Sequence, residues 1–291
     1  MAVRDLRPTL TSNPRLDVRK TYKLVVNGAF VRSESGRSYE IVDASGTFVA
    51  NVARASRKDV RDAVVAARAA QAKWWAATAY NRGQVLYRLA EMAESRRDEL
   101  RDHVALAEAS EAVAAVARAI DRVVWYAGWT DKIAQVYGST NPVAGPFFNF
   151  SHPTPSGVVA VLAHPTSFEG LIDQVMAPLA AGNTVVVVAS ERHPTPAVLL
   201  GELSVTADFP PGVLNVLTGS LDELAPVVCA HEDVDGVDLS GVADALLGEL
   251  RSLSAESIKR VVRAGFASDA DSLRRLRTFI ETTTVWHTVG Q

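Results

Sequence analysis

The chain has 291 residues, a formal net charge of −3 and a single cysteine, Cys229. The near-neutral charge indicates no basic surface for a nucleic acid or an anionic membrane, and the lone cysteine excludes a disulfide framework and a thiol zinc site. No apolar run of about 18 residues is present, so no membrane span is expected. We expect residues 1–20 to form a flexible tail without a signal peptide, and the protein to be cytoplasmic.

The first third of the chain predicts short strands followed by long helices. The segment 22–29 reads as a strand that ends in an Asn-Gly turn, and a second short strand is expected at 39–42. Ser56 has the features of a helix N-cap, with Asp59 three residues later. Two longer helices are expected from Asn81 to Leu106 and from Glu111 to Ala134.

Between residues 139 and 156 the sequence instead predicts extended β structure. This segment contains several prolines, which sheet edges tolerate better than central strands do. It also contains three closely spaced phenylalanines: Phe147, Phe148 and Phe150. We therefore expect a ribbon that projects from the rest of the protein.

From residue 157 onward, apolar strands alternate regularly with helices. Strands are expected at 157–163, 184–189, 212–219, 235–240 and 258–262. Helices are expected at 169–181, 195–207, 222–230 and 243–253. Apolar strands separated by helices are typical of a parallel sheet that is covered on both faces. The sequence therefore predicts an α/β protein with a Rossmann-like, doubly wound parallel sheet.

A helix at 271–280 and a last strand at 281–290 complete the chain. The leucines of the helix at 243–253 are open to two interpretations: a contact with another subunit, or packing against the protein's own sheet. The six histidines show no metal-ligand spacing, so we expect no metal site.

Several of these segments together resemble the aldehyde dehydrogenase family. The most specific are YAGWTDKI (126–133), LAAGNTVVVVASE (179–191) and FPPGVLNVLTG (209–219), with HEDVDGVDLSG (231–241) and FIETTTVWHTVG (279–290) in support. The resemblance implies NAD(P)-dependent oxidation of an aldehyde by a cysteine thiolate, an oxyanion donor and a general base. It breaks after residue 265 and resumes near Thr278, which suggests a short member without the catalytic, cysteine-bearing domain.

The resemblance also implies how the chain is divided. Residues 21–138 and 157–265 correspond to the NAD-binding domain, with its N-terminal helices. Residues 139–156 and 266–291 correspond to an oligomerisation ribbon, a linker helix and a C-terminal strand. The residues expected to act in oligomerisation are the three phenylalanines of the ribbon with Val285 and Trp286 of the last strand.

The catalytic residues that the family uses have no counterparts in the matching segments, so no catalytic residue is expected. Cys229 lies in the cofactor half, where we expect an inert core residue. The position of the catalytic glutamate matches Ala264 or a neighbour. The oxyanion asparagine matches Pro165 if residues are counted back from Gly182, or Ser167 if the local motif is aligned.

A reduced cofactor site is expected at the ends of the predicted parallel strands. Val188 stands where the family has a ribose-binding lysine, whereas Glu191 matches the ribose-binding glutamate. Family glycines are replaced by Leu221, Ala225 and Leu246, and Gly-Ser-Thr becomes Gly-Val-Ala at 241–243. The remnant site comprises these residues: Pro165, Ser190, Glu191, Gly219 and Gly241. We expect weak NAD(P) binding or none.

The leading hypothesis is a non-catalytic subunit that assembles with a full-length aldehyde dehydrogenase and supports its activity. The family's catalytic residues are missing, whereas the segments that resemble its oligomerisation elements remain. An unpaired apolar edge strand at 281–289 would also need a partner. One alternative is the cofactor half of a split aldehyde dehydrogenase. A second is a sensor that binds a nucleotide in the remnant cleft.

Overall fold

The computed structural model describes residues 18–263 and 273–289. Its centre is a seven-stranded sheet with the order β12-β11-β8-β9-β10-β2-β3. Five of the strands run parallel to one another: β8 (Val158–Leu162), β9 (Thr184–Val188), β10 (Leu214–Leu217), β11 (Gly236–Asp238) and β12 (Arg260–Val262). The antiparallel hairpin of β2 (Leu24–Val26) and β3 (Ala29–Val31) closes one edge. The predicted α/β, doubly wound architecture is confirmed.

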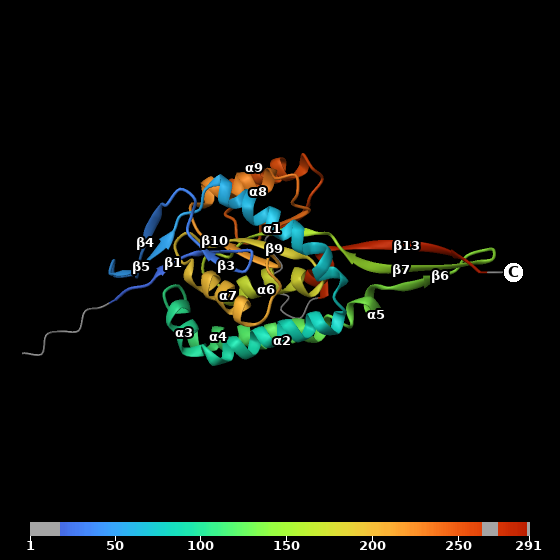
Figure 1. The fold of residues 1–291 in the computed structure, drawn as a ribbon, viewed down its shortest axis with the longest axis horizontal. Coiled ribbons are helices and arrows are strands. Elements are labelled where there is room, and N and C mark those ends of the chain that lie inside the picture. Colours follow the sequence, from blue (N-terminus) through green and yellow to red (C-terminus); the bar gives the residue numbers. More distant parts are fainter. Residues whose placement is uncertain (1–17, 264–272, 290–291) are drawn as a thin grey trace, which may run out of the picture.

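Helices cover both faces of this sheet, which is why its central strands are apolar on both sides (Figure 1). Every residue of β8 and β9 is buried. One face carries α1 (Arg57–Ala76), α8 (Leu221–Ala230) and α9 (Asp244–Ala255). The other face carries α6 (Phe168–Ala180) and α7 (Thr195–Thr206). An outer layer lies against α6 and α7, formed by α2 (Ala79–Ser95), α3 (Arg97–Val104) and α4 (Ala112–Trp129).

Local sequence signals set several of the element boundaries. The Ser56 hydroxyl accepts a hydrogen bond from the Asp59 amide, and the Asp59 carboxylate accepts one from the Ser56 amide. This reciprocal capping box starts α1 where the sequence predicted it. The turn between β2 and β3 uses Asn27 and Gly28, both with positive φ, as the Asn-Gly pair predicted.

The long helices predicted in the first half are each interrupted. The helix expected at 81–106 is broken at Arg96, which has φ −113° and ends α2. The helix expected at 111–134 ends at Trp129, and a separate short helix, α5, spans Ile133–Tyr137. A strand that the sequence reading missed, β5 (Phe48–Ala53), pairs with β4 (Ser38–Val42) and with β1 (Thr21–Tyr22) in a small second sheet.

A three-stranded sheet projects from the body of the molecule, as the ribbon prediction required (Figure 1). We call it the arm. It consists of β6 (Ser139–Asn141), β7 (Phe147–Pro155) and β13 (Ile280–Thr288), with β7 in the centre. β13 pairs with β7 along its whole length, so one of its edges is satisfied within the chain. Its other edge has no strand beside it among the described residues.

The segment that precedes β13 forms a short helix, and a buried ion pair holds this helix in place. The helix expected at 271–280 is α10 (Leu273–Thr278), and residues 271 and 272 lie outside the described residues. On this helix, Arg275 Nη1 lies 2.7 Å from Asp238 Oδ2 at the end of β11. The side chains are 9% and 0% exposed, respectively. This pair therefore fastens the C-terminal segment to the central sheet.

The predicted tail falls mostly outside the described part of the chain. Of residues 1–20, the structure describes only 18–20, and Lys20 there forms an ion pair with Glu202 at 2.6 Å. No helix among the described residues combines the length and the apolar character needed to span a membrane.

The leucines of α9 resolve one open alternative. Leu247 and Leu250 are buried, and Leu246 and Leu253 pack against the same core cluster. Packing against the protein's own sheet therefore explains this leucine pattern, and a subunit contact is not needed to explain it.

Candidate functional site

The central sheet changes its winding direction between β8 and β11. β9 and β10 lie on one side of β8, whereas β11 and β12, which follow them in the chain, lie on the other. In open parallel sheets, ligands bind outside the carboxyl ends of the strands at such a switch point. The residues that leave the sheet there are Ala163 after β8 and Ser240 and Gly241 after β11.

A buried glutamine holds the two strand ends at this point together. The Gln174 side chain, on α6, donates to the Leu162 carbonyl and to Ser240 Oγ, each at 3.0 Å. Its own carbonyl oxygen accepts from the His164 amide at 2.8 Å. Because Gln174 is only 1% exposed, these bonds fix both loops relative to the helix beneath them.

A cleft of about 310 Å³ opens above these loops. Four of the five sequence-predicted cofactor residues line it: Pro165, Ser190, Glu191 and Gly241. The fifth, Gly219, does not. Gly219 has φ +151°, and a Cβ atom there would lie 3.2 Å from the Ala55 amide nitrogen. A glycine at this position is therefore explained by the backbone conformation.

The polar groups of the predicted site bond to neighbouring parts of the chain. Ser190 Oγ donates to the Pro165 carbonyl at 2.9 Å and so joins the loops after β8 and β9. Glu191 Oε2 accepts from the Leu221 amide at 3.3 Å, at the first residue of α8. Glu191 therefore caps the N-terminus of α8. Its carboxylate occupies the Leu221 amide, which could otherwise bind an anion.

The glycine of the β11–α9 turn is required by close packing. A Cβ atom at Gly241 would lie 2.5 Å from the backbone of Ala163 and Leu162. Gly241 would be needed for this turn even if no phosphate were ever bound, so its presence is weak support for a phosphate site.

The residues that follow this glycine do not favour a phosphate. Val242 is buried with the core cluster, and α9 begins without any side-chain cap. Asp244 stands in the first turn of α9, and Asp222 and Glu223 stand in the first turn of α8. Carboxylates at a helix N-terminus compete with an anionic ligand for the positive end of the helix dipole. The described residues therefore fit a dinucleotide pyrophosphate poorly.

The residue that aligns with the family's ribose-binding lysine, Val188, does not reach the cleft. Val188 is the last residue of β9, is 0% exposed and packs in the core on the α1 and α8 face of the sheet. A valine there offers no polar group to the cleft.

Neither candidate for the oxyanion donor is an asparagine, and both take part in local hydrogen bonds. Pro165 has no amide hydrogen, and its carbonyl already accepts from Ser190. Ser167 is the N-cap of α6, and its hydroxyl accepts from the Gly170 amide at 3.0 Å. The Ser167 amide itself donates to His164 Nδ1 at 2.8 Å.

Cys229 lies within α8 and is 0% exposed, as the sequence suggested for a core residue. Burial raises the pKa of its thiol to about 11, an effect that outweighs a hydrogen bond with Ser254. A thiol with this pKa supplies very little thiolate at neutral pH. No group of three or more His, Cys, Asp or Glu side chains in the described ranges is arranged to bind a metal ion.

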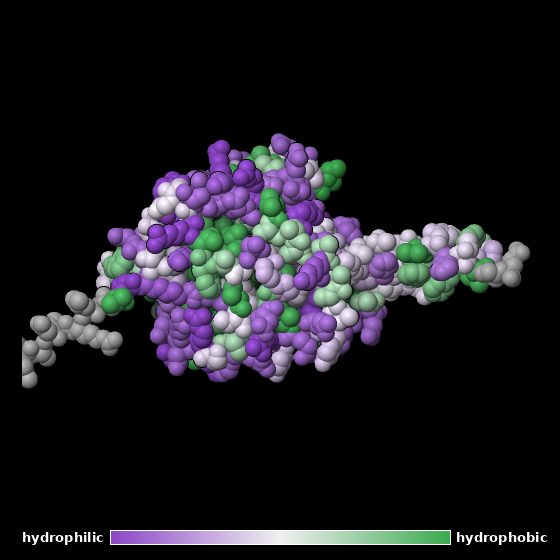
Figure 2. Space-filling view, in the orientation of Figure 1, coloured by the Kyte–Doolittle hydropathy of each residue, from purple (hydrophilic) through white to green (hydrophobic). Residues whose placement is uncertain are grey.

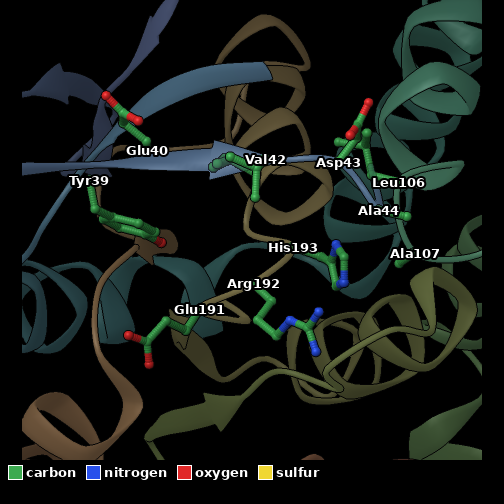
Figure 3. A pocket seen from close by; sticks show the side chains of 11 residues that line it. Tyr39, Glu40, Val42, Asp43, Ala44, Leu106, Ala107, Glu191, Arg192 and His193 are labelled. Atoms are coloured by element: carbon green, nitrogen blue, oxygen red, sulfur yellow. The ribbon is translucent and has the colours of Figure 1, made fainter. Parts of the chain in front are cut away.

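A second cavity of about 350 Å³ adjoins this cleft and shares lining residues of the loop after β9 with it. Figure 3 shows Tyr39 and Val42 of β4 across this cavity from Glu191, Arg192 and His193. Arg192 and His193 line both cavities, and the sequence reading gave them no role. Their position immediately after Glu191 was the signal that could have identified them.

The residues predicted for oligomerisation come together on the arm. Val285 is opposite Phe150 in the β7–β13 register, and the Phe147 and Trp286 rings meet edge to face with centroids 5.9 Å apart. Trp286 is 62% exposed, and Phe147 and Phe148 are 40% and 48% exposed. The space-filling view shows hydrophobic residues along the arm (Figure 2).

The comparisons with known proteins agree with this fold. The model of the aldehyde dehydrogenase family matches residues 30–263. The putative aldehyde dehydrogenase DhaS of Bacillus subtilis (strain 168) is 33% identical over 87% of this chain and 52% of its own length. Human retinal dehydrogenase 2 is 33% identical over 90% of this chain and 51% of its own length.

Solved structures give the same result. The structure described as the NAD+ complex of an aldehyde dehydrogenase from Bacillus cereus superposes with a TM-score of 0.77 and 28% identity, over 84% of this chain and 50% of that one. The HpcC structure from Thermus thermophilus gives a TM-score of 0.78, also with 28% identity, over 84% of this chain and 48% of that one. The chain thus spans about half the length of the relatives that it matches. The chain belongs to the aldehyde dehydrogenase family.

Proposed function

We propose that this chain is a non-catalytic, aldehyde-dehydrogenase-like subunit that assembles with a full-length aldehyde dehydrogenase and supports its activity. The observation that carries the proposal is the arm. It presents the nine-residue strand β13 with one edge unpaired among the described residues, and it exposes large apolar side chains near its end. Proteins usually cover such an edge, because its free amide and carbonyl groups attract other strands.

The chemistry of the cleft supports the non-catalytic part of the proposal. The chain's one cysteine is buried with a raised pKa, Pro165 has no amide hydrogen to donate, and the Ser167 hydroxyl is engaged as the N-cap of α6. Val188 leaves the ribose-binding position without a charged group, and Glu191 is engaged as a helix cap. Weak NAD(P) binding, or none, follows from the same residues.

The partner is inferred from what the arm requires. An edge strand is completed most directly by another strand, through the main-chain hydrogen bonds of β-augmentation. The chain matches only about half of the length of these relatives, which therefore carry further structure that could supply such a strand. A full-length family member is thus the partner that fits both the fold and the free edge.

The test is co-purification from the native cells, together with a variant that disfavours strand pairing at the free edge of β13. The tagged chain should recover a full-length aldehyde dehydrogenase in near-stoichiometric amount. Trp286→Lys places a charge on the exposed edge strand and should reduce that recovery by about tenfold or more. Val113→Lys, which changes an apolar residue on α4 that is 64% exposed, should leave the recovery unchanged. Recovery of the wild-type chain alone would contradict the proposal.

A split dehydrogenase is the second candidate, since the switch-point cleft itself is retained. In that case a mixture of the chain with its partner would bind NAD(P) more tightly than the partner does alone. A purely non-catalytic subunit would give no such gain, and equilibrium dialysis with NAD distinguishes the two.

A further inference from the structure

We propose that a hollow beside β3, the outermost strand of the central sheet, binds an aromatic molecule that carries one carboxylate group. The hollow has a volume of about 390 Å³ and is formed by the β2–β3 hairpin with the segment before it, the junction of α2 with α3, and α7. We call it the edge hollow. Within the described ranges it shares no lining residue with the switch-point cleft. The α2–α3 junction also lies at the opposite end of the body from the arm, so a ligand here is separate from the proposed subunit contact (Figure 1).

The alternation of side chains in the hairpin places an aromatic ring at the edge hollow. Val25 of β2 is buried and faces α7, since a Cβ atom at Gly201 on α7 would lie 2.9 Å from Val25 Cγ2. Phe30 is directly opposite Val25 in the β2–β3 register, and directly paired residues project to the same face of a sheet. Phe30 therefore stands on the α7 face, but on the outermost strand, where it remains 46% exposed. Its ring offers an uncovered apolar surface to a ligand.

The charged residues of the edge hollow form a network that is nearly complete. The lining contains one acidic residue, Glu202, and three basic ones: Lys20, Lys23 and Arg96. Glu202 is engaged at both oxygens, because Lys20 Nζ lies 2.6 Å from Oε1 and Arg96 Nη2 lies 3.0 Å from Oε2. Arg96 also donates through Nε to Glu99 at 2.6 Å. Two cations and two carboxylates therefore neutralise one another.

Lys23 is the cation that this network leaves over. It is exposed, and its ammonium group forms no ion pair or hydrogen bond with the part of the chain that the structure describes. The edge hollow thus has an excess of one positive charge, which matches a single carboxylate better than a phosphate dianion. Thr21 is also exposed and lines the hollow, and its hydroxyl can donate to the same anion.

Sheet packing alone does not explain this pair of an exposed ring and a free cation. Lysines often lie on edge strands and prevent them from pairing with other chains. Such a lysine would belong on β3, yet β3 consists of Ala29, Phe30 and Val31. Lys23 instead precedes β2, which is paired on both sides, by β10 and by β3. A ligand with a ring and a carboxylate would cover the one and pair with the other.

An aryl carboxylate with a short chain fits the edge hollow in size. Its volume of about 390 Å³ lies within the range of small-molecule sites, which is about 300–1,000 Å³. The ring of the ligand would pack on Phe30 in an offset or edge-to-face arrangement. Its carboxylate would accept a charge-assisted hydrogen bond from the Lys23 ammonium, and the aliphatic stem of Lys23 would add apolar contact.

The test is isothermal titration calorimetry of the purified chain with three probes: 3-phenylpropanoate, 3-phenylpropan-1-ol and butanoate. The first has both the ring and the charge, the second has only the ring, and the third has only the charge. Phenylpropanoate should bind, and the other two should bind at least about tenfold more weakly. Raising the salt concentration should weaken phenylpropanoate binding, because salt screens an exposed charge pair.

Variants assign the binding to the edge hollow. Lys23→Met keeps an apolar stem but removes the charge, and it should weaken phenylpropanoate binding by about tenfold, whereas Lys23→Arg should retain it. Phe30→Leu should weaken binding by about fivefold through loss of the ring contact. Lys73→Met, at an exposed lysine in the last turn of α1, is the matched control and should change nothing. Circular dichroism verifies that each variant is folded.

Three outcomes would overturn the proposal. One is the absence of saturable heat with phenylpropanoate up to its solubility limit. Another is binding of the uncharged alcohol as tight as that of phenylpropanoate. The third is wild-type affinity in Lys23→Met. None of them would affect the proposed subunit role, which the co-purification experiment tests separately.

Discussion

The buried pair of Arg275 and Asp238 gives the sharpest stability prediction. The two side chains are 9% and 0% exposed and meet at 2.7 Å, and they join α10 to the end of β11. Replacing Arg275 by methionine leaves the Asp238 carboxylate buried without its cation. Breaking a buried ion pair in this way typically costs about 3–5 kcal/mol.

The remaining partners of Asp238 place the expected cost at the lower end of that range. Asp238 Oδ1 still accepts from the Ser240 amide at 2.9 Å, from the Ser240 hydroxyl and from Gln174 Nε2 at 3.3 Å. We therefore expect Arg275→Met to lower the free energy of unfolding by about 3 kcal/mol, or the melting temperature by roughly 6–12 °C.

Urea titration followed by circular dichroism measures this change. The matched control is Arg277→Met, because Arg277 is exposed on the same helix and should tolerate the change within about 0.5 kcal/mol. The double variant Arg275→Met/Asp238→Asn should recover much of the lost stability, since the buried charge is removed and an amide oxygen can still accept from Ser240 and Gln174. A loss below about 1 kcal/mol for Arg275→Met would show that the pair does not anchor the C-terminal segment.

Three further predictions concern packing, pH and thiol reactivity. Gly241→Ala should lower the free energy of unfolding by about 1–3 kcal/mol, because its Cβ would lie 2.5 Å from the Ala163 backbone. The control is Gly248→Ala, where nothing lies within 4 Å of the added Cβ. It should be neutral or stabilising by up to about 1 kcal/mol in the same urea titration. A tolerated Gly241→Ala would show that the turn is looser than the structure indicates. Burial lowers the pKa of His103 below its ordinary 6.5, so the stability that depends on its neutral form is present above that pH and is lost as the pH falls. Urea midpoints should drop as the pH falls below about 6.5, less steeply for His103→Gln, and an equal slope in that variant would exclude His103 as a contributor. Cys229, with its raised pKa and no exposure, should react with a thiol reagent such as DTNB at neutral pH only after denaturant is added, and rapid labelling of the folded chain would contradict its burial.

Much of the fold follows from local sequence signals. The valine runs of β8 and β9 and the capping box of Ser56 and Asp59 each predict their own element, because the required residues lie within a few positions of one another. β5 was missed, since Asn51 and its alanines dilute the strand signal. The break at Arg96 carries no glycine or proline to mark it.

The site was predictable in position but not in its contacts. Glu191 lies at the cleft where the resemblance places it, whereas its bond to the Leu221 amide joins residues 30 positions apart. The pairing of Asp238 with Arg275 joins residues 37 positions apart, and nothing near either residue indicates it. Contacts of this kind depend on how helices pack over the sheet, which no short window of sequence determines.

The most direct test of the proposed function is an assay of aldehyde-dependent NADH formation by the purified chain alone, with Cys229→Ser in parallel. We predict no rate above background in either protein, because the one thiol is buried in α8 and burial raises its pKa. A rate in the wild-type chain that disappears in Cys229→Ser would contradict the non-catalytic assignment.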